Sequence, residues 1–376
     1  MTTKAYDPQQ NLIGLITGRL PFLAKKKIAI GFDGFVDSIV RVVKSKDGGL
    51  REFIPEMGGF GAYIIAQKGH NFFVELDEVV TKSGGNMPNF ANALAQFGCN
   101  ISCVGALGYP SIHQAFKTLP ANCTLYGYAN PGITTALEFN DGKILMSQIG
   151  SLNLATWDTV NERVGQSILS NIFSGCDLIG VLNWGELDNA TSLWRGLLEN
   201  ILANTTIPEK KPIVFFDLCD CSKRTHTAIA EVLDVIAAHA KYFKVVLSLN
   251  GHEARVVGSV LGGSAANGSL EDIGASIYKG RAADMVLVHQ ASEAMLWHEG
   301  QLFKRKSFFT TQPKISTGAG DNFNAGFCAG LLMELDPHAC LLLAHATSAC
   351  YLQSGVSPLP ETLARFIKSN LANLSQ

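Results

Sequence analysis

The sequence predicts an α/β fold, in which a mostly parallel central sheet is flanked by helices on both faces. Short apolar runs, typical of strands buried on both faces, alternate with longer segments of helical pattern. This alternation is typical of parallel strands joined by crossover helices. Hydrophobic residues make up 47% of the 376 residues and charged residues only 16%, so the chain is able to bury a substantial core.

The strands of this sheet are predicted at continuous apolar runs, and the helices at the longer segments between and after them. The segment Leu12–Leu23 is too short and too interrupted for a signal peptide or a membrane span, so we expect an amphipathic helix on the domain surface. The predicted strands are Lys27–Gly31, Ile101–Gly105, Leu178–Leu182, Ile213–Asp217, Val245–Leu249 and Met285–His289. The other predicted helices are Met87–Phe97, Asn161–Phe173, Ala190–Ala203, Arg224–Ala240, Glu253–Leu261, Phe323–Leu332, His338–Tyr351 and Pro360–Leu371.

Two regions break the alternation and predict a second, small β-sheet. Residues 44–83 are long for a connection and contain a glycine-rich stretch at 57–61. In the second region, a strand-like run meets Asn140-Asp141-Gly142, a hairpin signal. We expect parts of 38–83 and 132–148 to pair as a small β-sheet lid over the main sheet. No repeat or linker divides the chain, so residues 1–376 are expected to form a single domain.

Charge and cysteine content argue against several classes of partner. The 30 basic and 32 acidic residues give a net charge of -2, which indicates neither a nucleic-acid nor a membrane-surface partner. The nine cysteines have neither the spacing of a small disulfide scaffold nor that of a zinc site. We therefore expect reduced thiols in a cytoplasmic protein.

The strongest chemical motif is Ser-Thr-Gly-Ala-Gly-Asp at residues 316–321, where an apolar helical segment opens. Its glycines allow several backbone N–H groups to point at one spot, and the helix N-terminus adds a positive partial charge there. The motif predicts an anion hole for a phosphoryl group, with Asp321 beside it to orient an attacking hydroxyl. The structural alternative is a helix start with an aspartate in its first turn.

A second motif follows the predicted strand Val245–Leu249. Asn250 lies at the strand end and Glu253 three residues later, at a helix start. Such a pair is typical of a capping box. The functional alternative is that Asn250 and Glu253 hold the water shell of Mg²⁺, an ion that keeps most of its waters.

Polar residues and glycines at two earlier strand and helix ends predict an acceptor site. Gly84 and Gly85 precede a helix and allow a ligand to approach the backbone, while Asn89 can donate and accept hydrogen bonds. Asp33 and Asp37 follow the first strand, at the edge where open α/β sheets bind ligands. One of these carboxylates can take two hydroxyls of a polyol. The structural alternatives are a simple loop-to-helix turn at residues 84–89, and Asp33 as a turn cap with Asp37 as a solvated edge residue.

Taken in order, these motifs resemble those of the ribokinase/PfkB carbohydrate-kinase family. The resemblance covers nearly the whole chain, from about Lys27 to the C-terminus. It rests on an early Asp, Gly-Gly-x-x-x-Asn, Asn-x-x-Glu and Gly-Ala-Gly-Asp, in that order. It implies a ribokinase-like fold, ATP and Mg²⁺ as cofactors, and transfer of the γ-phosphoryl group to a hydroxyl of a sugar or nucleoside.

The resemblance also implies a role for each matching residue. Asp321 would be the base, and the amides of Gly318, Ala319 and Gly320 would form the anion hole. The nucleotide and its Mg²⁺ would be bound by Thr317, Asn250 and Glu253. Asn250 and Glu253 would contact the ion through water. Asp37, Gly84, Gly85 and Asn89 would hold the acceptor, with Asp33 as the competing carboxylate. A homodimer through the small sheet is a further expectation.

The chain departs from the family pattern at three places. Ile315 stands where the family usually has an Asp that helps to bind a monovalent cation, so potassium activation is not expected. Residues 288–294 lack the two glycines that usually flank the nucleotide, and 108–110 replace a Gly-Asp-Asp-like turn. These departures leave open a catalytically silent, metabolite-binding relative. A dinucleotide-dependent oxidoreductase fits poorly, because no Gly-x-Gly-x-x-Gly follows the first strand.

Three further positions have competing interpretations. Arg224, in an Asp-rich loop after Asp217, either faces the phosphates or belongs to a salt-bridged loop. Trp184 either packs in the core, which we favour, or lines the acceptor pocket. His289 ends a strand and has no assigned role.

Overall fold

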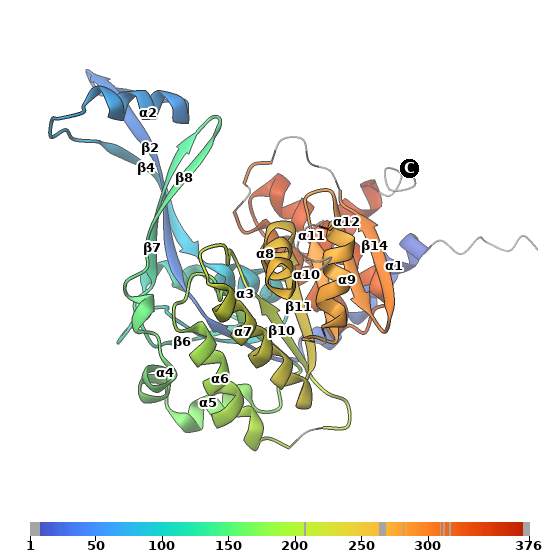
Figure 1. Ribbon diagram of the computed structural model, residues 1–376. Coiled ribbons are helices and arrows are strands. Elements are labelled where there is room, and N and C mark those ends of the chain that lie inside the picture. The colour runs from blue at the N-terminus through green and yellow to red at the C-terminus, as the bar shows by residue number, and fades with distance from the viewer. Residues whose placement is uncertain are drawn as a thin grey trace, which may run out of the picture.

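The structure is a computed structural model that describes residues 8–370, except 207, 263–267, 281, 309, 311–312 and 316. Ser316, the first residue of the glycine-rich motif, and Leu371, the end of the last predicted helix, lie outside the described residues. The chain forms a large body built around one sheet, from which a smaller sheet projects (Figure 1).

The large sheet has nine strands in the order β14-β13-β12-β11-β10-β9-β1-β5-β6. Neighbours from β6 to β12 are parallel, and β13 and β14 are added antiparallel at one edge. All six predicted strands are confirmed, and the three that sequence reasoning missed lie toward the edges. The strands are β1 (Lys27–Phe32), β5 (Asn100–Gly105), β6 (Cys123–Gly127), β9 (Leu178–Leu182), β10 (Ile213–Asp217), β11 (Lys244–Asn250), β12 (Met285–His289), β13 (Glu293–His298) and β14 (Gln301–Lys306).

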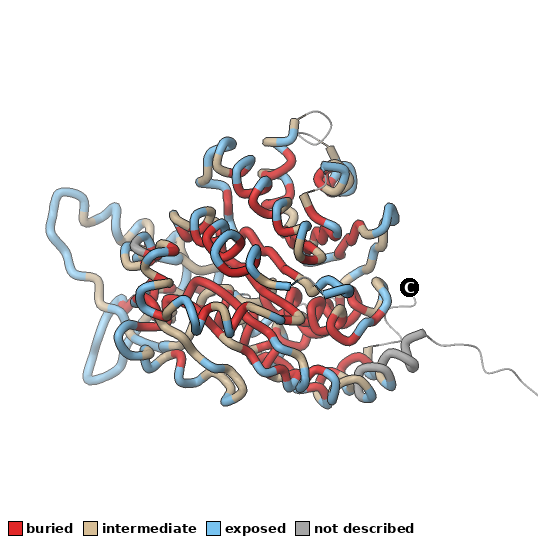
Figure 2. The backbone as a smooth tube through the Cα atoms, turned by 90° about the horizontal axis from the view of Figure 1, so that it is seen from below, coloured by how far each residue is buried: buried red, intermediate tan, exposed pale blue. Residues whose placement is uncertain are grey.

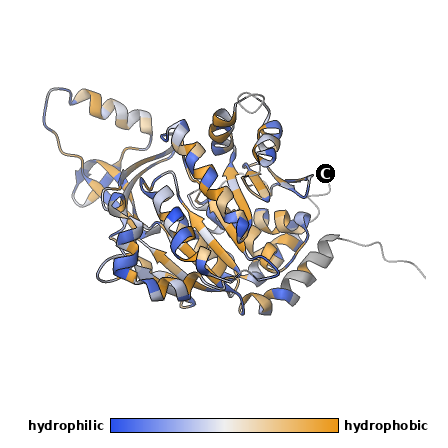
Figure 3. Cartoon of the chain, turned by 60° about the horizontal axis from the view of Figure 1, so that its bottom comes forward, coloured by the Kyte–Doolittle hydropathy of each residue, from blue (hydrophilic) through white to orange (hydrophobic). Residues whose placement is uncertain are grey.

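Helices cover both faces of this sheet, as predicted. Buried side chains alternate between the faces along β1, where Ile28 and Ile30 pack on one side and Ala29 on the other. The strands form the hydrophobic centre of the molecule (Figure 3), and the residues coloured as buried are concentrated there (Figure 2). One face packs against α1 (Pro8–Leu23), α3 (Asn86–Gln96), α10 (Ala319–Leu332), α11 (Pro337–Ser354) and α12 (Pro360–Asn370). The other packs against α4 (Trp157–Val164), α5 (Gln166–Phe173), α6 (Ala190–Asn200), α7 (His226–Ala238), α8 (Gly251–Leu261) and α9 (Leu270–Lys279).

One helix prediction needs correction, and one helix of the large body was missed. The single helix predicted over Asn161–Phe173 is two helices, α4 and α5, because Gly165 between them has φ +96°, which a helix does not allow. Helix α9 was not predicted. Among the described residues, no helix is both long and apolar enough to cross a bilayer, and all nine cysteines are unpaired.

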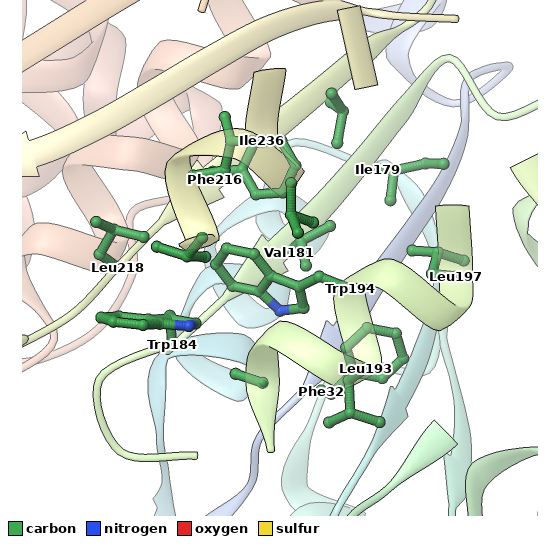
Figure 4. Close-up of a cluster of buried hydrophobic side chains, with 14 of the residues drawn as sticks. Phe32, Ile179, Val181, Trp184, Leu193, Trp194, Leu197, Phe216, Leu218 and Ile236 are labelled. Atoms are coloured by element: carbon green, nitrogen blue, oxygen red, sulfur yellow. The ribbon is translucent and has the colours of Figure 1, made fainter. Parts of the chain in front are cut away.

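Trp184 is a core residue, as favoured from the sequence. It is 1% exposed, and its Nε1 donates to Thr191 Oγ1 at 2.8 Å. It lies at the end of a cluster in which Trp194 packs against Phe216 (Figure 4). This cluster supports the loop that follows β9, and that loop contributes to the site described below.

The small sheet has the strand order β3-β2-β7-β8, and β4 also pairs with β2. The predicted hairpin at 140–142 joins β7 to β8. The strands are β2 (Phe35–Asp47), β3 (Leu50–Phe53), β4 (Leu76–Gly84), β7 (Gly132–Phe139) and β8 (Gly142–Gln148). The sheet stands away from the large body in Figure 1.

A helix that the sequence did not predict, α2 (Met57–Ala66), crosses the outer end of the small sheet. Its glycines argued against a helix, but Phe60 is buried and its ring lies 5.7 Å from that of Phe139. Tertiary contact therefore outweighs local propensity here. Together with Val40, Val42, Ile54 and Leu137, these residues form a hydrophobic core separate from that of the large sheet.

Candidate active site

The candidate site lies where the order of strands reverses in the large sheet. From β1 the chain proceeds to β5 and β6 on one side, and β9 to β12 follow on the other. In open α/β sheets, the crevice at the carboxyl ends of the strands beside such a reversal is the usual ligand site. Asp33 follows β1, Asn183 follows β9 and Asp217 ends β10, so their polar side chains converge at this edge.

The carboxylate of Asp33 connects two parts of this edge through hydrogen bonds. Its Oδ2 accepts hydrogen bonds from the Asn86 backbone and from Asn183 Nδ2, and its Oδ1 accepts one from the Met87 backbone, all at 2.8 Å. The carboxylate therefore caps the start of α3 and joins it to the end of β9. Burial raises the pKa of Asp33 to about 6, against the lowering effect of these hydrogen bonds.

Asp321 lies in the first turn of α10. Gly318, before the helix, has φ +91°, and a Cβ there would come within 2.9 Å of the Tyr351 hydroxyl, so conformation and packing both favour glycine. The first amides of a helix have no partner within it. The amides after Gly318 are consequently suited to an anion, with the carboxylate of Asp321 close by.

The surroundings of Asp321 change its acidity. Asn89 Nδ2 donates to Asp321 Oδ2 at 3.0 Å, so Asn89, which sequence reasoning placed on the acceptor, contacts the candidate base. Burial, followed by repulsion from Asp217, raises the pKa of Asp321 well above its ordinary value. A carboxylate whose pKa is raised in this way accepts a proton more readily than a solvated one.

Two more buried carboxylates lie near Asp321. Asp217 accepts hydrogen bonds from Cys219 N at 2.9 Å and from Asn324 Nδ2 at 2.7 Å, and burial raises its pKa to about 6. Glu253 has its pKa raised well above the ordinary value by burial and then by Asp217. Among the described residues, no group of three or more acidic, histidine or cysteine side chains forms a ready metal cage. A divalent cation held through water would relieve this concentration of acidic groups.

The capping box predicted at the start of α8 is present. Asn250 Oδ1 accepts from the amides of His252 and Glu253 at 2.9 Å, and Glu253 Oε2 accepts from the Asn250 amide at 2.8 Å. Asn250 Nδ2 also donates to Glu253 Oε1 at 2.6 Å. The interpretation of Asn250 and Glu253 as a capping box is therefore confirmed. Their binding of the waters of Mg²⁺ stays a prediction.

A large cavity of about 780 Å³ opens beside α8 and α10. The ring of His289 lies 4.8 Å from that of Phe323, which in turn lies 5.1 Å from His345. Burial lowers the pKa of His289 to about 4 and that of His345 to about 3, so both rings are neutral at physiological pH. Other lining residues include Asn250, Gly251, Arg255, Gln290, Ala291, Ala319 and Gly320. The altered segment 288–294 therefore borders this cavity.

A smaller cavity, of about 160 Å³, lies between the small sheet and the segments that follow β9 and β10. Asp37 is half-buried in this cavity. Burial raises its pKa above the ordinary value, and Lys82 and Thr134 offset only part of that rise. A Cβ on Gly84 would come within 2.2 Å of the Asp37 carboxylate, so Gly84 is required by this contact. The other polar side chains lining the cavity include Asn86, Lys143, Ser147, Asn183, Glu186 and Thr317.

The structure thus places the predicted site residues in distinct positions. Asp37, Gly85 and Thr317 line the small cavity, and Asn250, Ala319 and Gly320 line the large one. Six predicted site residues line neither cavity: Asp33, Gly84, Asn89, Glu253, Gly318 and Asp321. The carboxylate of Asp33 is used within the fold. Sequence reasoning missed Lys82, Thr134 and Asn183. Only Asn183 carried a signal, as a polar residue directly after a buried strand at the reversal point.

Arg224 does not face the large cavity. It donates to the carbonyl oxygens of Trp184 at 2.8 Å and Gly185 at 3.2 Å, and also to that of Leu187. Its guanidinium lies 4.8 Å from the Trp184 ring. Of its two interpretations, the structural one applies, because Arg224 holds the loop that contains Glu186.

Comparison with known proteins agrees with this geometry. A sequence model described as prokaryotic ketohexokinase matches residues 18–370. A ketohexokinase of Haloferax volcanii is 25% identical over 360 residues, which cover 92% of each chain. Arabidopsis thaliana ribokinase, solved with ribose and ATP, superposes with a TM-score of 0.61 at 16% identity, covering 91% of this chain and 99% of its own.

A protein of E. coli assigned as ribokinase II, solved with ATP and Mg²⁺, superposes with a TM-score of 0.62 at 14% identity, covering 92% of this chain and 99% of its own. At these identities the two superpositions show the fold, which is ribokinase-like as predicted. The family model covers most of the chain. This protein therefore belongs to the prokaryotic ketohexokinase family and is a carbohydrate kinase.

Proposed function

We propose that this protein transfers the γ-phosphoryl group of ATP to a hydroxyl of a ketohexose, with Asp321 as the base. One observation carries the proposal. The residues at the start of α10 border both cavities, since Thr317 lines the small one while Ala319 and Gly320 line the large one. Asp321 belongs to the same turn, which supports a base placed between a space for a sugar and a space for a nucleotide.

The residues present fit ATP and Mg²⁺. The amides of Gly318, Ala319 and Gly320 suit a phosphoryl group, and Asn250 and Glu253 suit the waters of the cation. Bound Mg-ATP supplies the phosphoryl group and balances negative charge in the transition state. The neutral His289 ring, against Phe323, offers an apolar face to a flat base in place of the glycines that segment 288–294 lacks.

The protein's own groups would align and activate the acceptor. Asp37 would accept hydrogen bonds from two sugar hydroxyls, with Gly85 beside them. Asp321, held by Asn89, would take the proton of the hydroxyl that is phosphorylated. General-base assistance of this kind contributes on the order of 10²–10⁴ in rate. Ketohexose is proposed as the acceptor because a ketohexokinase is among the relatives of this chain.

We further propose that the small sheet acts as a lid and as a dimer contact. Its face with Asp37 borders the small cavity, so its closure would exclude water and limit ATP hydrolysis. The opposite face exposes Val79, Ile133 and Met146, an apolar surface that a second copy of the sheet would cover. Light scattering of the purified protein tests the dimer, and a monomer at all concentrations would contradict it.

A coupled ADP-release assay with Mg-ATP, over a panel of ketohexoses, aldoses, sugar acids, sugar phosphates and nucleosides, tests the proposed function. We expect ketohexoses to give the highest kcat/KM and Asp321→Asn to give almost none. Faster turnover of a nucleoside would identify a nucleoside kinase. Acceptor binding without ADP release would identify a silent metabolite-binding protein.

A further inference from the structure

Lys82 lies beside Asp37 in the small cavity, although neither motif nor spacing pointed to it. On the small sheet, Asp37 of β2 is paired with Lys82 of β4 and with Thr134 of β7, and Thr134 is paired with Ser147 of β8. These four polar side chains form one row across the sheet. All four line the small cavity, so the row faces the space proposed for the acceptor.

Within the described part of the chain, the ammonium group of Lys82 has a charge interaction with Asp37 but neither a hydrogen bond nor a close ion pair. Lys82 is half-buried, and none of the ion pairs or hydrogen bonds found among the described residues includes its side chain, whereas Lys143, in the same cavity, is paired with Glu138 at 3.0 Å. Burial lowers the pKa of Lys82, Asp37 raises it, and Lys143 lowers it further. A partly buried cation that lacks a hydrogen-bond acceptor is costly, and a ligand with free oxygen lone pairs would supply one.

Sugar hydroxyls match a carboxylate and an ammonium group side by side. A carboxylate only accepts hydrogen bonds and an ammonium only donates them, but a hydroxyl does both. A hydroxyl that donates its proton to Asp37 still has lone pairs available for Lys82. Hydrogen bonds to charged groups are also roughly twice as strong as neutral ones.

We propose that Lys82 is an acceptor-binding residue, which donates hydrogen bonds to the oxygens of the same sugar hydroxyls that Asp37 holds through their protons. This inference rests on the proposed function and deepens it, because it makes the acceptor a neutral diol. Asp37 accepts the protons of its hydroxyls, and Lys82 donates to their oxygens. A deoxy sugar that lacks one of these hydroxyls removes a hydrogen bond from both charged groups at once.

The test compares Lys82→Met with wild type, using the acceptor that the ADP-release panel selects. Methionine keeps most of the chain length and removes the charge. We expect KM for the acceptor to rise about 10- to 100-fold, with KM for ATP unchanged. The preference of wild type for that acceptor over its deoxy analogues should shrink in the variant. Lys44→Met is the matched control, since Lys44 lies on the same sheet but is exposed and paired with Glu52 at 2.6 Å.

Two further measurements distinguish direct binding of the sugar by Lys82 from an indirect effect of Lys82 on the ionisation of Asp37. If Lys82 acted only by keeping Asp37 ionised, the defect in KM would vanish as pH rises, and that result would overturn the proposal. If Lys82→Met folds poorly by thermal melting, Lys82→Gln, which keeps a neutral donor, should show a smaller rise in KM. An unchanged acceptor KM in a stable variant also overturns the proposal.

Asp37→Asn combined with Lys82→Met completes a double-mutant cycle. Because both residues are proposed to hold the same hydroxyls, their effects on kcat/KM should be strongly non-additive. Additive effects would contradict the shared contact. If no sugar or nucleoside of the panel is phosphorylated, the proposed function itself is refuted. If wild type is active and Lys82→Met has the same acceptor KM, only this inference is refuted.

Discussion

The two cavities beside the start of α10 are assembled in different ways. The large one is bordered by the starts of α8 and α10, the end of β12, the segment after β14 and the second half of α11. The Asn250–Glu253 capping box is a local contact beside it. The small one joins Asp37, Lys82, Thr134 and Asn183, which come from four separate strands or strand ends. The proposed phosphate and Mg²⁺ groups at the helix starts of the first therefore depend on local backbone geometry, whereas the polar groups of the second depend on two sheets being placed correctly relative to each other.

The comparison also shows a difference in charge. Neutral His289 and His345 rings and the exposed Arg255 line the large cavity, whereas Asp37 and Lys82 bring half-buried charges to the small one. We infer that shape, backbone amides and one exposed cation govern recognition in the large cavity, and that buried charged hydrogen bonds govern it in the small one. Substitutions at the junction and in each cavity test this division.

The largest effect is expected at the junction. Asp321→Asn is nearly isosteric and removes the proposed base, so turnover should fall by about 10²- to 10⁴-fold. Binding of nucleotide and acceptor, measured by calorimetry, should remain. Burial and repulsion from Asp217 raise the pKa of Asp321, so its removal should not lower the melting temperature. Turnover above about a tenth of wild type would exclude an essential base.

The pH dependence of wild type gives an independent check. Because the pKa of Asp321 is raised, the carboxylate is protonated at a pH where an ordinary aspartate is still ionised. Activity should therefore be present above the raised pKa and be lost as pH falls through it. An acid limb at the pKa of an unperturbed aspartate would contradict this assignment.

Next in size is the contrast between the two early carboxylates. Asp37→Ala should lower kcat/KM for the acceptor by roughly 30- to 1000-fold, with ATP affinity nearly unchanged. Asp33→Ala instead leaves two backbone amides and Asn183 without their acceptor, and should cost about 1–3 kcal/mol of folding free energy. Thermal melting and acceptor kinetics on both variants separate the roles. A crippled Asp33→Ala beside an active Asp37→Ala would reverse our assignment.

The sequence was informative about one cavity and much less about the other, for a physical reason. The capping box and the glycine before Asp321 are local patterns, and the buried strands of the large sheet are continuous apolar runs, so all were predicted. Lys82 and Thr134 depend on the register between strands far apart in the chain, which no local pattern specifies. Asn89 was singled out, but its contact with Asp321, 232 residues away, could not be foreseen.

A smaller effect is expected on the nucleotide side. Glu253→Gln should weaken activity by about tenfold, mainly at low magnesium, if the carboxylate organises waters of the ion. Because Glu253 also completes the capping box, the melting temperature must be measured in parallel. An equal loss at every magnesium concentration, together with lower stability, would make Glu253 a helix cap only.

The smallest effect is expected from monovalent cations. Ile315 is half-buried and lines the small cavity, and its side chain offers no oxygen where related kinases usually have a carboxylate. Replacing sodium by potassium should change kcat by less than about twofold. Clear activation by potassium would show that backbone carbonyls and Thr317 form a cation site without it.

The separate core of the small sheet has a consequence for how the protein opens. Phe60, Phe139, Val42 and their neighbours pack with one another and not with the large sheet, so the contacts that hold this unit together do not depend on the rest of the chain. Such a unit can unfold locally at a lower free energy than the whole molecule. Amide hydrogens of β2 and β7 beyond residues 40 and 137 should then exchange together, ahead of those in β9 and β10.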